Sequence, residues 1–269
     1  IENELENYEV RESQYHFSKD CLKTIENNNI LVSEAGPGLG KSIGYLIPAI
    51  HKLDKQKVII STSTHSLQSQ LLKKDIPLVS RALNKNIKAI IIKGKSNYLC
   101  YEKMNIAINN INNLLSNREI LEFMTLVFWA NDTLSGDVSE CGSFNVKQSK
   151  KIWDLIKYDN EQCFHHRSQN NSKCFYSNIR REAKDSNIFI VNHALLASNI
   201  DNQDLFHKNS SVIIIDEAHK LIENSREQLT DLLSYKMIKS EYNSIVLLVS
   251  DIIEKYKSNN EILDCYNHL

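Results

Sequence analysis

Ala35-Gly36-Pro37-Gly38-Leu39-Gly40-Lys41-Ser42 is the stretch that decides the fold, because three of the chain's seven glycines lie within five of its residues. It follows an apolar run, Ile30–Val32, and precedes a helix-like one, Ile43–Leu53. A loop that binds phosphate needs this order of strand, small-residue turn and helix start. Glycines let the backbone bend so that successive N–H groups point at phosphate oxygens. A glycine-rich turn with a chance lysine is the alternative, and the flanks and spacing favour the loop.

The residue types in this loop suit a nucleotide with a bound metal ion. Lys41 would reach the β- and γ-phosphates of ATP, and the Ser42 hydroxyl would hold Mg²⁺. Ala35 stands at the first position of the usual G-x-x-x-x-G-K-[ST] pattern, which is a small departure. The predicted nucleotide contacts are made by Ala35, Gly36, Pro37, Gly38, Leu39, Gly40, Lys41 and Ser42.

Composition is that of an ordinary globular protein. The chain has 269 residues, of which 42% are hydrophobic and 24% charged, enough for one large or two small domains. The formal net charge is −1, so nucleic acid would have to bind a local basic face. No apolar run reaches the roughly 18 residues of a membrane span, and no secretion signal is recognisable. We therefore expect a cytoplasmic protein whose six cysteines are thiols or metal ligands rather than disulfides.

The order of elements predicts an α/β fold with a mainly parallel sheet. Short β-branched runs alternate with helix-like segments up to residue 92, which indicates βαβ units. The alternation then stops between Tyr98 and about Arg181, where segments 106–115 and 120–130 are helix-like. The expected strands are 30–33, 58–62, 87–92, 188–191 and 212–215, and the other expected helices are 43–53, 66–83 and most of 220–269.

An acidic pair follows the last of these strands. Asp216 and Glu217 stand directly after Val212–Ile215, and ligands of parallel sheets bind at such strand ends. Asp216 can hold the water shell of Mg²⁺, and Glu217 can polarise the water that attacks the γ-phosphate. His219 would then sense the γ-phosphate. In isolation the pair could equally be acids favoured by a helix dipole, and the phosphate loop earlier in the chain favours the catalytic interpretation.

Several segments in order and at matching spacing resemble superfamily 2 DNA helicases of the DinG/XPD type. The resemblance covers nearly all of residues 8–220 and implies a RecA-like motor lobe. It rests on Arg11–Gln14, the phosphate loop, Ser61–Gln70, Val191–Leu196 and the Asp-Glu-Ala-His box at 216–219.

The resemblance also implies roles outside the phosphate loop. Gln14 would read the adenine, with Arg11 in the same element, and Ser61–Gln70 would contact the backbone of a nucleic acid strand. The residue types alone allow simpler roles as well. Gln14 could be a solvated helix residue, and the Ser and Thr hydroxyls could cap a helix.

The insertion carries four cysteines, of which three match a cluster pattern of the family. Cys100, Cys163 and Cys174 resemble the first, second and fourth ligands of a [4Fe–4S] cluster, but Ser168 stands where the third is expected. A hydroxyl is a poor substitute for a soft thiolate ligand. Cys141 could complete the set, three cysteines could hold an incomplete cluster, or all four could be inert buried thiols. Zinc held by Cys163, Cys174 and His165 or His166 is a further alternative.

The resemblance implies an ATP-dependent DNA helicase of 5′→3′ polarity, acting on single-stranded or forked DNA in DNA repair. A run at Lys147–Lys151 and the pair Arg180–Arg181 could contact phosphates, or be solvated surface charge. Family members have a second motor lobe, so we expect this chain alone to hydrolyse ATP poorly. A truncated, non-catalytic nucleic-acid-binding protein is the alternative. The implied domains are 1–97 (first part of the motor lobe), 98–182 (cysteine-bearing insertion), 183–220 (return to the lobe) and 221–269 (start of a helical arch).

Overall fold

A four-stranded, wholly parallel sheet organises the protein, in the strand order β2-β3-β1-β4. The computed structural model describes residues 11–36, 38–53, 57–159, 174–199 and 211–229 of the chain. The parallel sheet confirms the predicted α/β class. Its strands are β1 (Lys57–Thr62), β2 (Ala89–Ile91), β3 (Ile188–Asn192) and β4 (Ser211–Ile215).

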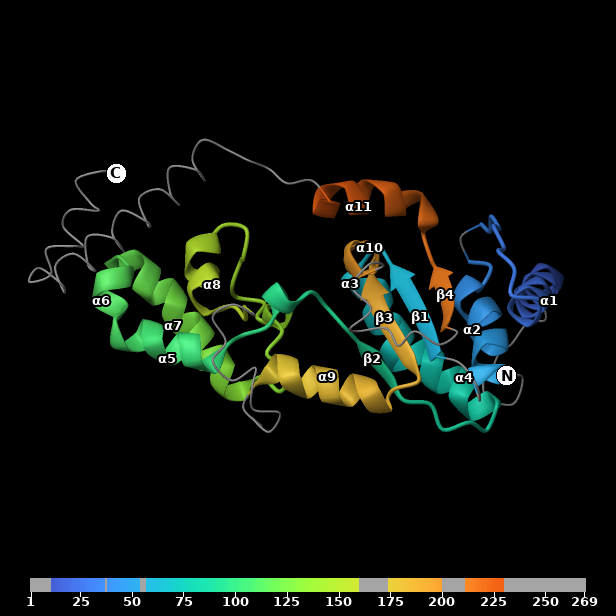
Figure 1. Ribbon diagram of the computed structural model, residues 1–269, viewed down its shortest axis with the longest axis horizontal. Helices are drawn as coiled ribbons and strands as arrows, with labels where there is room; N and C mark the ends of the chain where they lie inside the picture. The colour runs from blue at the N-terminus through green and yellow to red at the C-terminus, as the bar shows by residue number, and fades with distance from the viewer. Residues whose placement is uncertain (1–10, 37, 54–56, 160–173, 200–210, 230–269) are drawn as a thin grey trace, which may run out of the picture. The chain divides into compact units, whose positions relative to one another are not determined.

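Helices cover both faces of this sheet (Figure 1). On one face, the even-numbered residues of β1 and β3 pack with α1 (Glu12–Glu26), α2 (Lys41–His51) and α4 (Ile76–Ala82). On the other face, Ile59, Phe189 and Val191 pack with α9 (Phe175–Asp185) and α10 (His193–Asn199). Burial on both faces explains why these strands read as continuous β-branched and apolar runs rather than as alternating ones.

The register brings the carboxyl ends of three strands to one edge. Thr62, the last residue of β1, pairs with Asn192, the last of β3, and Ser61 pairs with Ile215, the last of β4. Residues that follow these strands are therefore close together, although they are far apart in the chain.

The insertion forms its own apolar core from local helices. Leu99, Phe123, Leu126 and Trp153 are each at most 3% exposed within it. Helix α7 starts at a capping box in which Ser116 and Glu119 satisfy each other's backbone N–H groups. The helices are α5 (Tyr101–Asn109), α6 (Ile111–Leu114), α7 (Asn117–Asp132) and α8 (Lys150–Ile156), with short 3₁₀ turns at Lys95–Asn97 and Val138–Glu140.

Helix α9 runs from the insertion to the sheet. Phe175 in its first turn packs into the insertion core, whereas Ala183 in its last turn packs on the sheet. The predicted domain boundary at residue 182 therefore lies inside a helix, and the domain limits stay a prediction.

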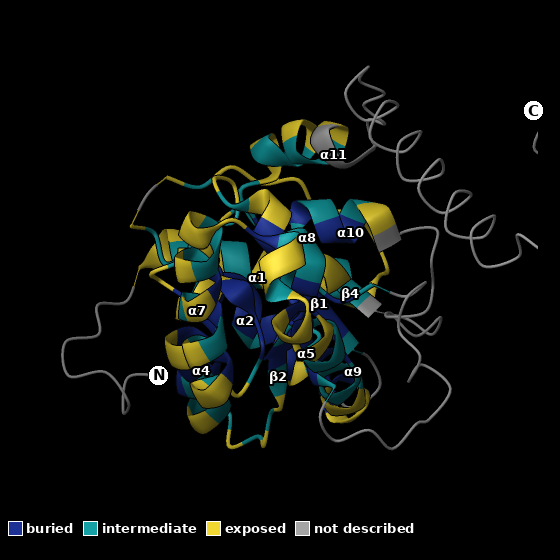
Figure 2. Cartoon of the chain, turned by 90° about the vertical axis from the view of Figure 1, so that its left-hand side faces the viewer, coloured by how far each residue is buried: buried dark blue, intermediate teal, exposed yellow. Residues whose placement is uncertain are grey.

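One predicted strand is wrong. Residues 30–33 form no strand, and Ile30 and Val32 are each 92% exposed. An apolar run becomes a buried strand only when a neighbouring strand offers hydrogen bonds, and no described strand pairs with this one. Figure 2 shows the burial of the chain, in which α1 has no buried residue whereas α2 is largely buried.

The predicted helices are found with shifted limits. Pro48 lies within α2 near its end, and the segment 66–83 is built of α3 (His65–Gln70), a π-helical turn (Leu71–Asp75) and α4. After a 3₁₀ turn at Ala218–Lys220, helix α11 (Leu221–Leu229) is the described part of the predicted C-terminal helical region. Among the described helices, none combines the length and the apolarity that a bilayer crossing requires.

Candidate functional site

The predicted phosphate loop leads into the first turn of α2. Gly38 and Gly40 have φ angles of 79° and 77°, in the left-handed region that favours glycine. Lys41 is the first residue of the helix, so Lys41 and Ser42 stand where free N–H groups and the helix dipole attract an anion. Of the eight loop residues, Pro37 lies outside the described part.

Arg11, just before α1, and Gln14, in its first turn, both hold the phosphate loop. The Arg11 guanidinium donates a hydrogen bond to the carbonyl of Gly38, and Gln14 Nε2 donates to the carbonyl of Gly40 at 2.9 Å. A Cβ at Gly40 would collide with the Gln14 amide. The structure thus brings this predicted pair to the nucleotide loop, where its side chains fix the loop backbone.

The acidic box meets the phosphate loop at the sheet edge. Glu217 Oε1 lies 3.7 Å from Lys41 Nζ, and Glu217 Oε2 lies 3.4 Å from His219 Nε2. Asp216 Oδ2 accepts a hydrogen bond from the Tyr45 hydroxyl at 3.1 Å, across 171 residues of chain. Glu217 itself has a left-handed φ of 58°, which is costly for a side-chain-bearing residue.

The oxygen atoms gathered here suit a magnesium ion. Mg²⁺ prefers hydroxyl, carboxylate and phosphate oxygens and keeps several waters. The Ser42 hydroxyl contacts Tyr45, which in turn binds Asp216, so the two predicted magnesium ligands share one neighbour. Burial is the main cause that raises the pKa of Tyr45 far above its usual value, and the Asp216 carboxylate adds to it. Tyr45 therefore stays a neutral donor at physiological pH.

Two residues of this site were not predicted from the sequence. Tyr45 lies one helical turn after Ser42, and that spacing was a usable signal. Asp75 is 4% exposed and accepts a hydrogen bond from Gln70 Nε2 at 3.0 Å. Burial raises the pKa of Asp75, while hydrogen bonds from Gln70 and from Ser42 act against it. No local pattern marks Asp75, because its partner Ser42 is remote in the chain.

The segment Ser61–Gln70, which is predicted to contact a nucleic acid strand, is only partly accessible to solvent. Ser61, Thr62 and Gln68 are buried, and Thr64 caps α3 by accepting from Leu67 N at 3.3 Å. The capping that the residues alone allowed is thus present. Exposed positions remain for contacts with a ligand at Thr64, His65, Ser66, Ser69 and Gln70.

The described cysteines of the insertion, Cys100, Cys141 and Cys174, divide between two clusters. Cys100 and Cys174 pack against the same aromatic cluster of Tyr98, Tyr158 and Tyr176. Cys141 is buried in the separate core around Phe123, with its Sγ 3.8 Å from Ser143 Oγ. Within the described ranges no three Cys, His, Asp or Glu side chains group as metal ligands would. Cys163, His165, His166 and Ser168 lie outside these ranges.

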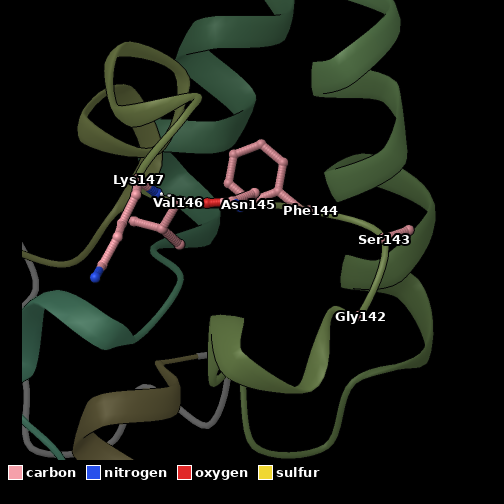
Figure 3. A pocket seen from close by; sticks show the side chains of 6 residues that line it. All are labelled: Gly142, Ser143, Phe144, Asn145, Val146 and Lys147. Atoms are coloured by element: carbon pink, nitrogen blue, oxygen red, sulfur yellow. Dashed lines mark hydrogen bonds between the residues drawn. The ribbon is translucent and has the colours of Figure 1, made fainter.

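Of the lysines predicted to contact phosphates, one is in an ion pair and another is exposed. Lys151 Nζ lies 3.0 Å from Glu119 Oε1, whereas Lys147 is exposed. Lys147 ends a surface hollow lined by Gly142–Lys147, and Figure 3 shows its side chain extending away from Phe144. Arg181 bonds Asn178 at 3.1 Å. These placements leave the predicted phosphate contacts untested.

Comparison with known proteins gives a consistent picture. The sequence profile of the DEAD_2 family matches residues 60–238. The chain is 33% identical over 238 residues to the ATP-dependent DNA helicase YoaA of Escherichia coli (strain K12), covering 86% of this chain and 36% of that protein. It is 32% identical over 241 residues to the 3'-5' exonuclease DinG of Bacillus subtilis (strain 168), covering 88% of this chain and 25% of that protein. The chain therefore spans about a third or less of these relatives.

A solved structure described as an XPD helicase also matches. It has a TM-score of 0.46 and 15% identity, and the match covers 81% of this chain and 34% of that one. So distant a likeness adds nothing to the argument from the site.

Proposed function

The chain belongs to the DEAD_2 family, and from that premise we propose that it carries the nucleotide site of an ATP-dependent DNA helicase. The observation that carries the proposal is the approach of Glu217 to Lys41, at 3.7 Å, which joins the acidic box to the phosphate loop. Relatives named as a DNA helicase and as an exonuclease are much longer than this chain, so their whole activities are not transferred.

In the proposed mechanism the loop and the box act on one magnesium-bound triphosphate. Backbone N–H groups at the start of α2 and Lys41 would bind the phosphates, and Ser42 and Asp216 would hold the Mg²⁺ ion. The ion supplies charge neutralisation at the phosphates. Glu217 then orients the attacking water, and His219, which contacts Glu217, senses the γ-phosphate. Arg11 and Gln14 keep the loop in its binding conformation, and Gln14 would read the adenine.

We further propose that the exposed part of Ser61–Gln70 contacts the backbone of single-stranded or forked DNA. Hydroxyls, amides and helix N-termini are the groups that usually contact phosphates. Closure of a second motor lobe on ATP would move the strand, in the 5′→3′ direction. This role fits a cytoplasmic DNA-repair enzyme, with 1–97 and 183–220 as the lobe, 98–182 as the insertion and 221–269 as the start of an arch.

A binding experiment on this chain tests the nucleotide site. Lys41→Ala should weaken binding of a fluorescent ATP analogue with Mg²⁺ at least about 30-fold, because loss of a charged contact to an anion costs about 2 kcal/mol or more. Arg118→Ala is the matched control, since Arg118 is 92% exposed in the insertion. Equal affinity of Lys41→Ala and the unchanged chain would refute the site.

A second measurement separates the helicase from the non-catalytic alternative. Binding to oligothymidylate is measured with and without the ATP analogue. A change in affinity on adding nucleotide supports the motor interpretation. If the affinity for oligothymidylate is the same with and without the ATP analogue, and no ATP is hydrolysed, the result supports a non-catalytic nucleic-acid-binding protein.

For the insertion we propose an iron–sulfur cluster held by Cys100, Cys163 and Cys174. Cys100 and Cys174 already share one aromatic cluster, and Cys141 belongs to another core, so Cys141 is not proposed as the fourth ligand. Anaerobically purified protein should absorb near 400 nm and contain iron and sulfide. A colourless protein with zinc, or one with no metal, would contradict the cluster. Cys141→Ala is the control and should leave the spectrum unchanged.

A further inference from the structure

Ser61 lies at a junction of three strands at the carboxyl edge of the sheet. Its backbone carbonyl accepts a hydrogen bond from the N–H of Asp216 at 2.9 Å. Its hydroxyl lies 2.7 Å from Nδ1 of His193, the first residue of α10. Ser61 and His193 are both fully buried, at 0% exposed. Ser61, the first residue of the segment proposed to contact nucleic acid, is thus hydrogen-bonded both to Asp216 of the acidic box and to the buried imidazole of His193.

His193 has one satisfied and one unsatisfied ring nitrogen. Its Nε2 is buried and makes no well-formed hydrogen bond within the described residues, although the Glu217 backbone lies close enough to act on the ring as a hydrogen-bond partner. A buried polar atom without a partner costs free energy and is rare in native structures. Burial lowers the pKa of His193, and the backbone of Glu217 and the carboxylate of Asp216 act in the opposite direction. The imidazole is therefore neutral and lies against the acidic box.

Glu217, whose backbone acts on this imidazole, is the strained residue of the site. Its φ of 58° is left-handed, a conformation that costs about 1–3 kcal/mol in a residue with a side chain. The side chain of Glu217 would move with its peptide, and that side chain is the proposed water-orienting group.

We propose that His193 is a positioning residue that couples the Ser61–Gln70 segment to Glu217. This inference rests on the proposed function, because it takes the segment as the strand contact and Glu217 as part of the nucleotide site. A nucleic acid strand bound at the exposed part of the segment shifts Ser61, and the hydrogen bond to Nδ1 carries the shift to His193. The contact between the imidazole and the Glu217 backbone then tightens and sets the carboxylate for ATP.

The coupling is measured as a ratio of affinities. The dissociation constant of a fluorescent ATP analogue with Mg²⁺ is determined for this chain with and without saturating oligothymidylate. A coupling of ordinary size changes that constant about 5- to 150-fold. In His193→Ala the ratio should fall to one, while each ligand alone binds with nearly unchanged affinity.

Two further variants separate positioning from mere structural support. Asn in His193→Asn can keep the hydrogen bond to Ser61 but cannot reach Glu217, so it should restore thermal stability without restoring coupling. Ser61→Ala should also abolish coupling. Ser186→Ala is the matched control, because Ser186 is a buried serine, 3% exposed, ahead of β3 at the opposite end of the strand.

The outcomes are distinct. Coupling in His193→Ala or His193→Asn equal to that of the unchanged chain overturns the inference and leaves the proposed function standing. An unchanged chain that binds both ligands independently overturns the inference together with the motor interpretation. An unchanged chain that binds neither ligand overturns the proposed function, and the inference with it. Loss of coupling in Ser186→Ala as well would show a general defect and reject the specific path through His193.

Discussion

The sheet lobe and the insertion both bury apolar cores, but they bring their polar residues together in different ways. In the lobe, the parallel register aligns the ends of three strands, and residues as remote as Tyr45 and Asp216 meet there. In the insertion, helices pack locally and the thiols are shared between two clusters. In a parallel sheet the strand register alone brings the residues at the strand ends together, so a site can form there. In a helical bundle each ligand must come from a side chain at a suitable position on a facing helix.

The largest expected effect tests whether the insertion folds independently of the lobe. Phe123→Ala, at a residue that is 0% exposed, should destabilise the insertion by about 3–5 kcal/mol. Both tryptophans of the chain, Trp129 and Trp153, lie in the insertion, so tryptophan fluorescence during urea unfolding reports on it alone. Leu121→Ala, at an exposed residue of the same helix, is the control. Loss of ATP-analogue binding in parallel would show that the two regions fold as one unit.

The next effect concerns the ion pair that joins the two regions. Lys93, just after β2, pairs with Asp137 of the insertion, and both side chains are about nine-tenths buried. Lys93→Met should cost about 3 kcal/mol or more, because it leaves a buried carboxylate unpaired. Removing both charges in Lys93→Met with Asp137→Leu should cost less than the sum of the single changes. Urea unfolding of all three variants checks this, and additive costs would show that the pair does not link the regions.

A smaller effect contrasts one glycine from each region. Gly40→Ala should cost about 1–2 kcal/mol, since φ at this position is left-handed and the new Cβ collides with Gln14. Gly142→Ala in the insertion should be neutral, because a Cβ added at this position would meet no atom within 4 Å. Thermal unfolding measures both, and ATP-analogue binding should weaken in Gly40→Ala alone. Equal behaviour of the two variants would mean that the loop conformation in the lobe is unimportant.

The smallest expected effect is the acid response of the insertion. Hydrogen bonds from the Ser116 backbone N–H, from Lys151 and from the Ser116 hydroxyl lower the pKa of Glu119 from 4.5 to about 2. Because the folded pKa is depressed, this stabilisation is present above the unfolded pKa and is lost as pH falls towards 2. Fluorescence-monitored stability should therefore decline in that window, and Glu119→Gln should flatten the decline. An unchanged slope would assign the acid response to other groups.

The sequence predicted the lobe in some detail because its signals are local. The phosphate loop, the acidic box and the strands at 58–62, 188–191 and 212–215 were recognisable from glycines, spacing and β-branched runs. The strand at 30–33 was wrong because an apolar run says nothing about whether a pairing edge is available.

The missed elements have two different causes. Helix α9 carried a usable signal, since Phe175, Ile179 and Ala183 recur at helical spacing amid polar residues. The contacts of Asp75 with Ser42 and of Lys93 with Asp137 had none, because they join distant parts of the chain through tertiary packing. Short helices such as α8, with few turns, are set by the same packing.

Strand β4 has a consequence for handling the protein. It is an outer strand of the described sheet, and Ile213 and Ile215 are 54% and 37% exposed. An outer strand with free backbone groups and apolar side chains is a template for intermolecular β-pairing. Concentrated samples of this chain will therefore tend to self-associate, and a lysine at position 213 would be a simple way to keep them in solution.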